Sequence, residues 1–247
     1  MKIALVTGAS RGIGAAISLA CAEAGYDLAL NFARDENAAN ALAERIRVLG
    51  RRVIVVQADV SVEAEVLAMF ARIDAELGSL TALVNNAGIV ARGARLEEMD
   101  VERWRRMFDV NLIGTLLCSR EAARRMSTRH GGSGGAIVNL ASRAAQLGGP
   151  NQYVDYAASK GAIDSLTVGL GKELIGDGIR VNAVRPGIID TEIHATTAMP
   201  AHLGNAVASI PIRRMGSAEE VAQAVLWLLS DASSYTVGST IDVTGGR

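Results

Sequence analysis

Several residue types are scarce in this chain, and each shortage excludes a class of protein. Proline occurs 4 times in 247 residues, beside 26 glycines and 49% hydrophobic residues, which argues against a disordered or fibrous chain and favours a compact α/β protein. The two cysteines, Cys21 and Cys118, lie in apolar helical patterns, so we expect buried free thiols and no disulfide.

Long apolar runs are also missing. No stretch approaches the ~20 apolar residues of a membrane span, and the first residues turn glycine-rich before a signal peptide could develop. The formal net charge of −1 gives no sign of a nucleic-acid or acidic-membrane partner. We therefore expect a cytoplasmic protein that binds neither nucleic acid nor membrane.

Histidine and lysine are rare as well. His130, His194 and His202 do not share a metal-ligand spacing, and the sequence has no Cys/His cluster, so no metal is predicted. Three lysines stand beside 22 arginines. The two residue types are not interchangeable where a compact ammonium is needed, which draws attention to Lys160, four residues after Tyr156.

Short apolar runs alternate with longer amphipathic segments along the chain. The apolar runs predict strands over residues 2–6, 28–31, 53–57, 82–85, 136–140, 180–184 and 240–243. The amphipathic segments predict helices over residues 13–24, 36–49, 62–77, 101–126, 156–175 and 218–229. Because crossovers are right-handed, this alternation predicts one α/β domain over residues 1–247, a doubly wound parallel sheet of about seven strands with ligands at the carboxyl ends of the strands.

Residues 188–211 break this alternation. The segment lacks a clear period and is rich in threonine, alanine and methionine. Long irregular segments inside compact domains are often lids or binding loops. We expect a substrate lid here; the alternative is a plain surface loop.

A glycine-rich turn, TGASRGIG at residues 7–14, follows the first predicted strand and opens an apolar helix. Without Cβ atoms, Gly8, Gly12 and Gly14 let the backbone turn tightly and approach a pyrophosphate at the helix N-terminus. A purely structural turn is the alternative. The position after the first strand of a βαβ unit favours a dinucleotide site.

The second predicted strand indicates which dinucleotide binds. An acidic residue near its end would hold the ribose 2′-hydroxyl of NAD, but the strand ends in Phe32, and Arg34 follows. Arg34 and Arg11 can bind a 2′-phosphate, so the sequence favours NADP (NADPH). Two features count against this: Asp35 could neutralise Arg34, and Arg34 could be a solvated surface charge. Asp59 closes the third strand, where its carboxylate can meet the adenine amino group.

The stretch YVDYAASK, residues 153–160, contains the candidate acid. Tyr156 and Lys160 are four apart and share one face of a helix. A free tyrosine has a pKa of ~10, and a nearby ammonium lowers it toward the useful range. Tyr153 is two turns from Lys160, ~10 Å along a helix axis. Tyr156 is therefore the predicted acid, and Tyr153 lines the pocket or a packing surface.

Taken together, these motifs resemble the short-chain dehydrogenase/reductase family over nearly the whole chain. TGASRGIG is similar to the family's T-G-x-x-x-G-x-G turn, NNAG (85–88) to its N-A-G segment, and YAASK (156–160) to its Y-x-x-x-K. The resemblance implies a Rossmann fold and a catalytic tetrad of Asn111, Ser142, Tyr156 and Lys160. Two features depart from the pattern: Ala141 replaces a frequent serine, and Tyr156 follows Ser142 by 14 residues, one more than in many relatives.

The resemblance also implies a role for each residue. Ser142 and Tyr156 hold the substrate carbonyl oxygen, and Tyr156 donates the proton. Lys160 lowers the pKa of Tyr156 and binds the nicotinamide ribose, while Asn111 anchors a water that relays protons. The implied cofactor contacts are Gly8, Ser10, Arg11, Gly12, Ile13, Gly14, Arg34, Asp59, Val60, Asn86, Ala87, Gly88, Tyr156, Lys160, Pro186, Gly187, Ile189 and Thr191. The implied substrate contacts are Ser142, Tyr153 and Tyr156.

The sequence thus predicts an NADPH-dependent oxidoreductase acting on a small-molecule carbonyl or alcohol. The alternatives are a 3-oxoacyl thioester reductase or a sugar dehydrogenase of the same family. A catalytically silent NADP-binding sensor or scaffold is a different class, which the complete tetrad disfavours. The helix over 156–175 carries more apolar surface than one core face needs, and the resemblance implies pairing through it and the preceding long helix, so we expect a homo-oligomer, a tetramer. The alternative is that the helix is simply buried within the subunit.

Overall fold

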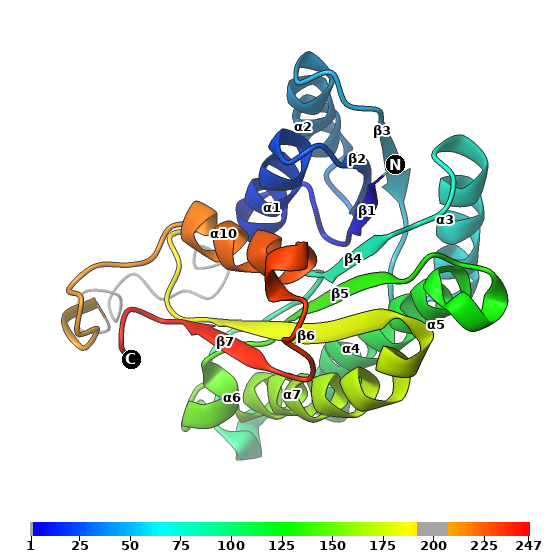
Figure 1. The fold of residues 1–247 in the computed structure, drawn as a ribbon. Coiled ribbons are helices and arrows are strands. Elements are labelled where there is room, and N and C mark those ends of the chain that lie inside the picture. The colour runs from blue at the N-terminus through cyan, green and yellow to red at the C-terminus, as the bar shows by residue number, and fades with distance from the viewer. Residues whose placement is uncertain (1, 192–206) are drawn as a thin grey trace.

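The computed structural model describes residues 2–191 and 207–247, which contain one parallel sheet (Figure 1). Its 7 strands follow the order β3-β2-β1-β4-β5-β6-β7. The strands are β1 (Ile3–Val6), β2 (Asp27–Phe32), β3 (Val53–Gln57), β4 (Ala82–Asn85), β5 (Gly135–Leu140), β6 (Ile179–Pro186) and β7 (Thr240–Val243). The order runs one way from β1 to β3 and the other way from β4 to β7. The doubly wound fold is confirmed, and its switch point lies between β1 and β4.

Helices cover both faces of this sheet, as Figure 1 shows. On one face lie α1 (Gly12–Glu23), α2 (Glu36–Val48) and α10 (Ala218–Leu229). On the other lie α3 (Glu63–Glu76), α4 (Val101–Phe108), α5 (Gly114–Met126) and α7 (Val154–Leu174). A short helix, α6 (Ala144–Leu147), follows β5. The strands are apolar on both sides because both faces of the sheet are covered.

Each face of the sheet has its own apolar layer, and each layer holds one cysteine. Cys21 lies in the layer that packs α1, α2 and α10 against the sheet. Cys118 lies in the opposite layer, with α3 and α5. Both are buried free thiols, as predicted. Burial raises the pKa of each thiol to about 12.

Every predicted strand and helix is present, with one error inside the predicted helix over residues 101–126. A π-helical turn, η2 (Asp109–Ile113), separates α4 from α5. The wider turn accommodates an extra residue and changes the direction in which the following side chains point. Asn111 lies in this turn and is buried. A hydrophobic pattern with a helical period carries no sign of such a turn.

The predicted lid over residues 188–211 falls largely outside the described residues, because residues 192–206 are not among them. Of the remainder, Ile189 is buried and forms a parallel bridge with Gly216. The start of this segment is therefore tied to the body of the fold.

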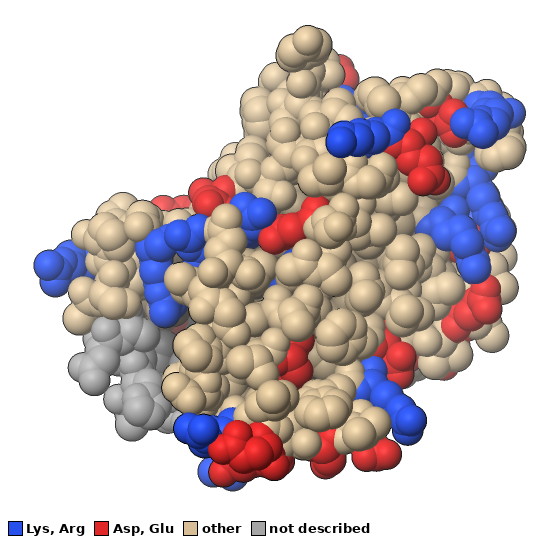
Figure 2. All heavy atoms as spheres, turned by 90° about the horizontal axis from the view of Figure 1, so that it is seen from below, with Lys and Arg blue, Asp and Glu red and all other residues tan. Residues whose placement is uncertain are grey.

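No helix within residues 2–191 and 207–247 is long and apolar enough to cross a membrane. On the side of the molecule seen in Figure 2, charged side chains of both signs occur in small groups among uncharged ones. The mixture agrees with the nearly balanced formal charge of the chain.

Candidate active site

The glycine-rich turn connects β1 to α1 at the carboxyl edge of the sheet. Gly8 and Gly12 have φ values of +61° and +54°, which glycine adopts without strain. A Cβ atom on Gly14 would lie 2.3 Å from the carbonyl oxygen of Gly8, so close packing requires a glycine there. The turn leads directly into the N-terminus of α1, where backbone N–H groups can bind a phosphate.

Side chains from neighbouring strands brace this turn. Asn31 of β2 accepts a hydrogen bond from the Gly8 N–H at 3.1 Å. Asn86, just after β4, donates to the carbonyl oxygens of Thr7 and Gly8, both at 2.9 Å. The Thr7 hydroxyl accepts from the N–H groups of Asn86 and Ala87 at 3.0 Å. Asn86 thus holds the turn itself. The hydrogen bonds of Thr7 and Asn31 were not predicted; Thr7 directly follows β1, and Asn31 lies near the end of β2.

A hollow of about 530 Å³ opens where β2 and β3 end, lined by Ala33, Arg34, Gln57, Asp59, Glu65 and Arg106. Arg106 of α4 donates to the Asp59 carboxylate and to the Ser61 hydroxyl, both at 2.8 Å. Burial works to raise the pKa of the Asp59 carboxyl, but hydrogen bonds from Ser61 and Arg106 outweigh it and leave the pKa below its usual value. Asp59 is therefore an ionised acceptor, already bonded to α4.

The two arginines predicted to bind a 2′-phosphate lie in different places. Arg34 lines the hollow, whereas Arg11 is the exposed N-cap residue of α1 and is not among the lining residues. Arg106 is the second guanidinium in the hollow. The Asp35 carboxylate accepts from the Ala38 N–H at 3.0 Å and caps α2. The carboxylate that follows Arg34 is thus engaged by its own helix.

The segment after β6 lies next to the glycine-rich turn. Gly187 donates its N–H to the Val243 carbonyl oxygen at 2.9 Å. A Cβ atom on Gly12 would lie 3.5 Å from the Thr191 side chain. Thr191 is therefore placed beside the turn at which a pyrophosphate would bind.

Tyr156 lies in the first turn of α7, near the end of β5. Burial raises the pKa of its phenol, and a hydrogen bond with Ser142 lowers it in part. The Tyr153 ring packs edge-on against the Tyr156 ring, with the centroids 6.0 Å apart and an interplanar angle of 86°. Tyr153 therefore supports the Tyr156 ring from the N-cap position of α7.

Lys160 is buried one helical turn beyond Tyr156. Its Nζ atom donates to the Leu140 carbonyl oxygen at 2.6 Å and lies 5.9 Å from the Tyr156 ring centroid. Burial lowers the pKa of Lys160 to about 8. The sequence predicted that Lys160 would lower the pKa of Tyr156, whereas the net shift is upward. The reason is that burial of the phenol is the largest effect.

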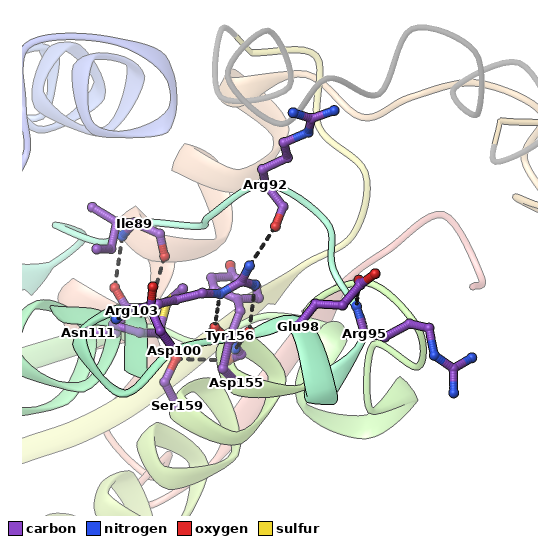
Figure 3. A network of polar contacts seen from close by, with 11 residues as sticks. Ile89, Arg92, Arg95, Glu98, Asp100, Arg103, Asn111, Asp155, Tyr156 and Ser159 are labelled. Atoms are coloured by element: carbon purple, nitrogen blue, oxygen red, sulfur yellow. Dashed lines mark hydrogen bonds and ion pairs between the residues drawn. The ribbon is translucent and has the colours of Figure 1, made fainter. Parts of the chain in front are cut away.

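Asn111 connects the loop after β4 to α7 (Figure 3). Its side-chain amide donates to the Ile89 carbonyl oxygen and to the Ser159 hydroxyl, each at 3.0 Å. Its side-chain oxygen accepts from the Ile89 N–H at 2.8 Å. A Cβ atom on Gly88 would lie 3.4 Å from Asn111 Oδ1 and 3.5 Å from Lys160 Nζ. Gly88 therefore lies next to both Asn111 and Lys160, and a Cβ atom there would make ordinary van der Waals contacts with them.

These side chains follow the carboxyl edge of the sheet from the hollow, past the glycine-rich turn, to Tyr156. A dinucleotide can span such an edge with its adenosine end at the hollow. Its nicotinamide end would then face Tyr156 and Ser142, whose hydroxyl groups suit a carbonyl oxygen that gains negative charge. Among residues 2–191 and 207–247, no three His, Cys, Asp or Glu side chains could hold a metal ion; His194 and His202 lie outside these ranges.

Comparisons with known proteins identify the family. A family model described as enoyl-(acyl carrier protein) reductase matches residues 8–247. The chain is 51% identical over 247 residues, 100% of both chains, to the Escherichia coli (strain K12) protein named uncharacterized oxidoreductase YgfF. It is 40% identical to the 3-oxoacyl-[acyl-carrier-protein] reductase FabG of Staphylococcus aureus (strain Mu50 / ATCC 700699), over 99% of this chain and 97% of the relative.

A solved structure agrees with these matches. A short chain dehydrogenase from Burkholderia cenocepacia J2315 in complex with NADP is 34% identical and has a TM-score of 0.91, covering 99% of this chain and 97% of that one. The similarity therefore extends over the sheet and the whole carboxyl edge. The chain belongs to the short-chain dehydrogenase/reductase family, and it is an oxidoreductase that transfers a hydride between a nicotinamide dinucleotide and a CH–OH or C=O group.

Proposed function

We propose that the protein is an NADPH-dependent reductase of carbonyl compounds in which Tyr156 is the general acid. The observation that carries this proposal is the position of the half-buried Tyr156 phenol, which is close enough to Ser142 for that hydroxyl to lower its pKa and lies one helical turn from Lys160. Two hydroxyl donors at one point can hold a carbonyl oxygen and stabilise the charge that develops on it. The bound cofactor would supply the hydride, and Tyr156 would supply the proton.

Lys160 and Asn111 have supporting roles in this proposal. The Lys160 ammonium is the candidate donor to the nicotinamide ribose. The Asn111 amide is already bonded to Ile89 and Ser159. A relay water at Asn111 would therefore have to bind the backbone carbonyl, which also accepts from the Thr115 hydroxyl at 3.1 Å.

The substrate class is a choice among ketones, 3-oxoacyl thioesters and sugars. The relative named 3-oxoacyl-[acyl-carrier-protein] reductase, 40% identical, favours the thioester class as the second candidate. The deciding experiment is NADPH oxidation by the purified protein with a panel drawn from all three classes. Failure to oxidise NADPH with any of them would count against a carbonyl reductase.

The preference for NADPH over NADH rests on Arg34. Arg34 lines the hollow, β2 ends in Phe32 and not in a carboxylate that could accept a ribose 2′-hydroxyl, and Asp35 caps α2. Arg34→Ala is expected to raise the Michaelis constant for NADPH about tenfold, because one charge-assisted hydrogen bond is lost. We expect no more than about tenfold because the negative charges of Asp59 and Glu65 in the same hollow weaken the attraction of a 2′-phosphate.

The same variant should leave the Michaelis constant for NADH almost unchanged, and steady-state kinetics with both cofactors measures this. Arg45→Ala, on an exposed part of α2, is the matched control and should change neither constant. A wild-type protein that uses NADH as well as NADPH would contradict the assignment and leave Arg34 as a surface charge.

The protein is also proposed to form a homotetramer through α5 and α7. Ile113, just before α5, Leu116 on α5 and Val168 on α7 are exposed apolar side chains. A second copy of the chain would bury them. Light scattering at micromolar concentration should give about four times the 25.8 kDa of one chain. A monomer mass would reject this assembly.

A further inference from the structure

A largely buried ion pair lies next to the backbone of the proposed catalytic tyrosine (Figure 3). Arg103 of α4 donates to Asp155 through two nitrogens, at 2.6 Å and 3.2 Å. The two side chains are 16% and 2% exposed. The Asp155 carboxylate also accepts from the backbone N–H of Tyr156 at 2.9 Å. Arg103 has a third contact, because it donates to the Arg92 carbonyl oxygen at 2.8 Å.

This arrangement repeats the geometry of Asn111. Asn111 joins Ile89, in the loop after β4, to Ser159 on α7. Arg103 joins the same loop, three residues later, to Asp155, one turn earlier on α7. Both bridging residues come from α4 and the η2 turn that directly follows it. Their partners on α7, Asp155 and Ser159, lie on either side of Tyr156 in the sequence.

The second bridge is anchored at both ends by helix N-termini. The N–H of Arg103 donates to Asp100, the N-cap of α4, at 2.7 Å. Asp155 and Tyr156 lie in the first turn of α7, where N–H groups lack partners within the helix. The Asp155 carboxylate accepts a hydrogen bond from one of these N–H groups, that of Tyr156, and the helix dipole favours a negative charge at this position.

A buried ion pair is weak as a source of stability, since apolar residues of similar volume often stabilise a fold as well or better. Its value at this place is geometric, because a planar guanidinium fixes direction as well as distance. We propose that Arg103 and Asp155 are positioning residues, which hold Tyr156 in place against the loop formed by residues 86–95. The catalytic consequence of this position rests on the proposed role of Tyr156; the position itself does not.

Two variants test the bridge. Asp155→Ala removes the acceptor of the Tyr156 N–H, and the double variant Arg103→Ala/Asp155→Ala removes the bridge without leaving a buried, unpaired charge. Asp155→Asn is the conservative variant, because its amide oxygen can still accept from Tyr156. Arg52→Ala is the matched control: Arg52 pairs with Asp27 at 2.9 Å, at the start of β2 and away from the carboxyl edge of the sheet.

Hydrogen–deuterium exchange measures how firmly Tyr156 and the loop over residues 86–95 are held, and it needs no substrate. Both bridge variants should speed exchange in peptides covering residues 86–95 and 153–160, and leave exchange in residues 136–140 unchanged.

In turnover of ethyl acetoacetate with NADPH, the kcat of both variants should fall between about tenfold and a hundredfold, because small misplacements of a catalytic group are costly. The dissociation constant for NADPH should stay within about twofold. Asp155→Asn should recover most of the kcat, and Arg52→Ala should lose stability only.

Unchanged exchange in both peptides would overturn the proposal, as would a double variant with the kcat of the wild type. If the wild type does not reduce ethyl acetoacetate, that result counts against the proposed function. The exchange measurement then still tests whether Arg103 and Asp155 hold Tyr156 in place. A loss of kcat in Arg52→Ala equal to that of the double variant would also overturn it, because the effect would then be general destabilisation.

Discussion

Tyr156→Phe is expected to lower turnover about a thousandfold, on the order of 4 kcal/mol of transition-state stabilisation. The phenol is the group that meets Ser142 at the site of the chemistry, and its removal leaves the carbonyl oxygen without the proposed proton donor. Phenylalanine keeps the ring, so the contact with Tyr153 and the fold should persist. Steady-state rates with the best substrate of the panel measure the loss, and fluorescence titration should give an unchanged dissociation constant for NADPH.

Tyr153→Phe is the matched control for this experiment. Its ring contacts Tyr156 edge-on, and that contact needs no hydroxyl group. Turnover should therefore stay within about twofold of the wild type, since the missing group has no place in the proposed transition state. An equal loss of turnover in the two variants would contradict the choice of Tyr156 over Tyr153. Near-normal turnover in Tyr156→Phe would contradict the proposed mechanism.

Gly14→Ala should abolish measurable NADPH binding and destabilise the fold. The added Cβ atom would lie 2.3 Å from the Gly8 carbonyl oxygen and 2.6 Å from Asn86 Nδ2. These two atoms are hydrogen-bonded to each other, so neither can move without opening the turn. We expect an affinity loss of at least about a hundredfold and a stability loss of about 1–3 kcal/mol, as for other overpacked sites.

The measurements for this variant are fluorescence titration with NADPH and denaturant unfolding. Gly176→Ala makes the same chemical change where an added Cβ atom meets nothing within 4 Å. It should leave NADPH binding unchanged and alter stability by less than about 1 kcal/mol. Normal NADPH affinity in Gly14→Ala would mean that the cofactor phosphates do not bind at this turn.

The fold could be predicted because its signals are local. Continuous apolar runs marked the strands, and the glycine spacing marked the turn between β1 and α1. Contacts between distant segments could not be read in this way. Arg106 and Asp59 are 47 residues apart, and Arg103 and Asp155 are 52 apart. Nothing in the sequence near Arg103 or Arg106 distinguishes them from other arginines of an amphipathic helix.

The chemistry at Tyr156 shows a second limit of sequence reasoning. The spacing of Tyr156 and Lys160 correctly placed both on one turn of α7. The hydrogen bond between Lys160 and the Leu140 backbone has no sequence signal, because every residue has a carbonyl oxygen. Burial of the phenol, which sets the direction of its pKa shift, likewise depends on how α7 packs in three dimensions.

The two buried cysteines provide a way to follow local unfolding without introducing a further cysteine. Alkylating reagents react with the thiolate, and a thiol with a pKa of about 12 carries almost none at neutral pH. Modification therefore has to wait until the surrounding layer opens. Because Cys21 and Cys118 lie on opposite faces of the sheet, the order in which they are alkylated in mild denaturant reports which face opens first.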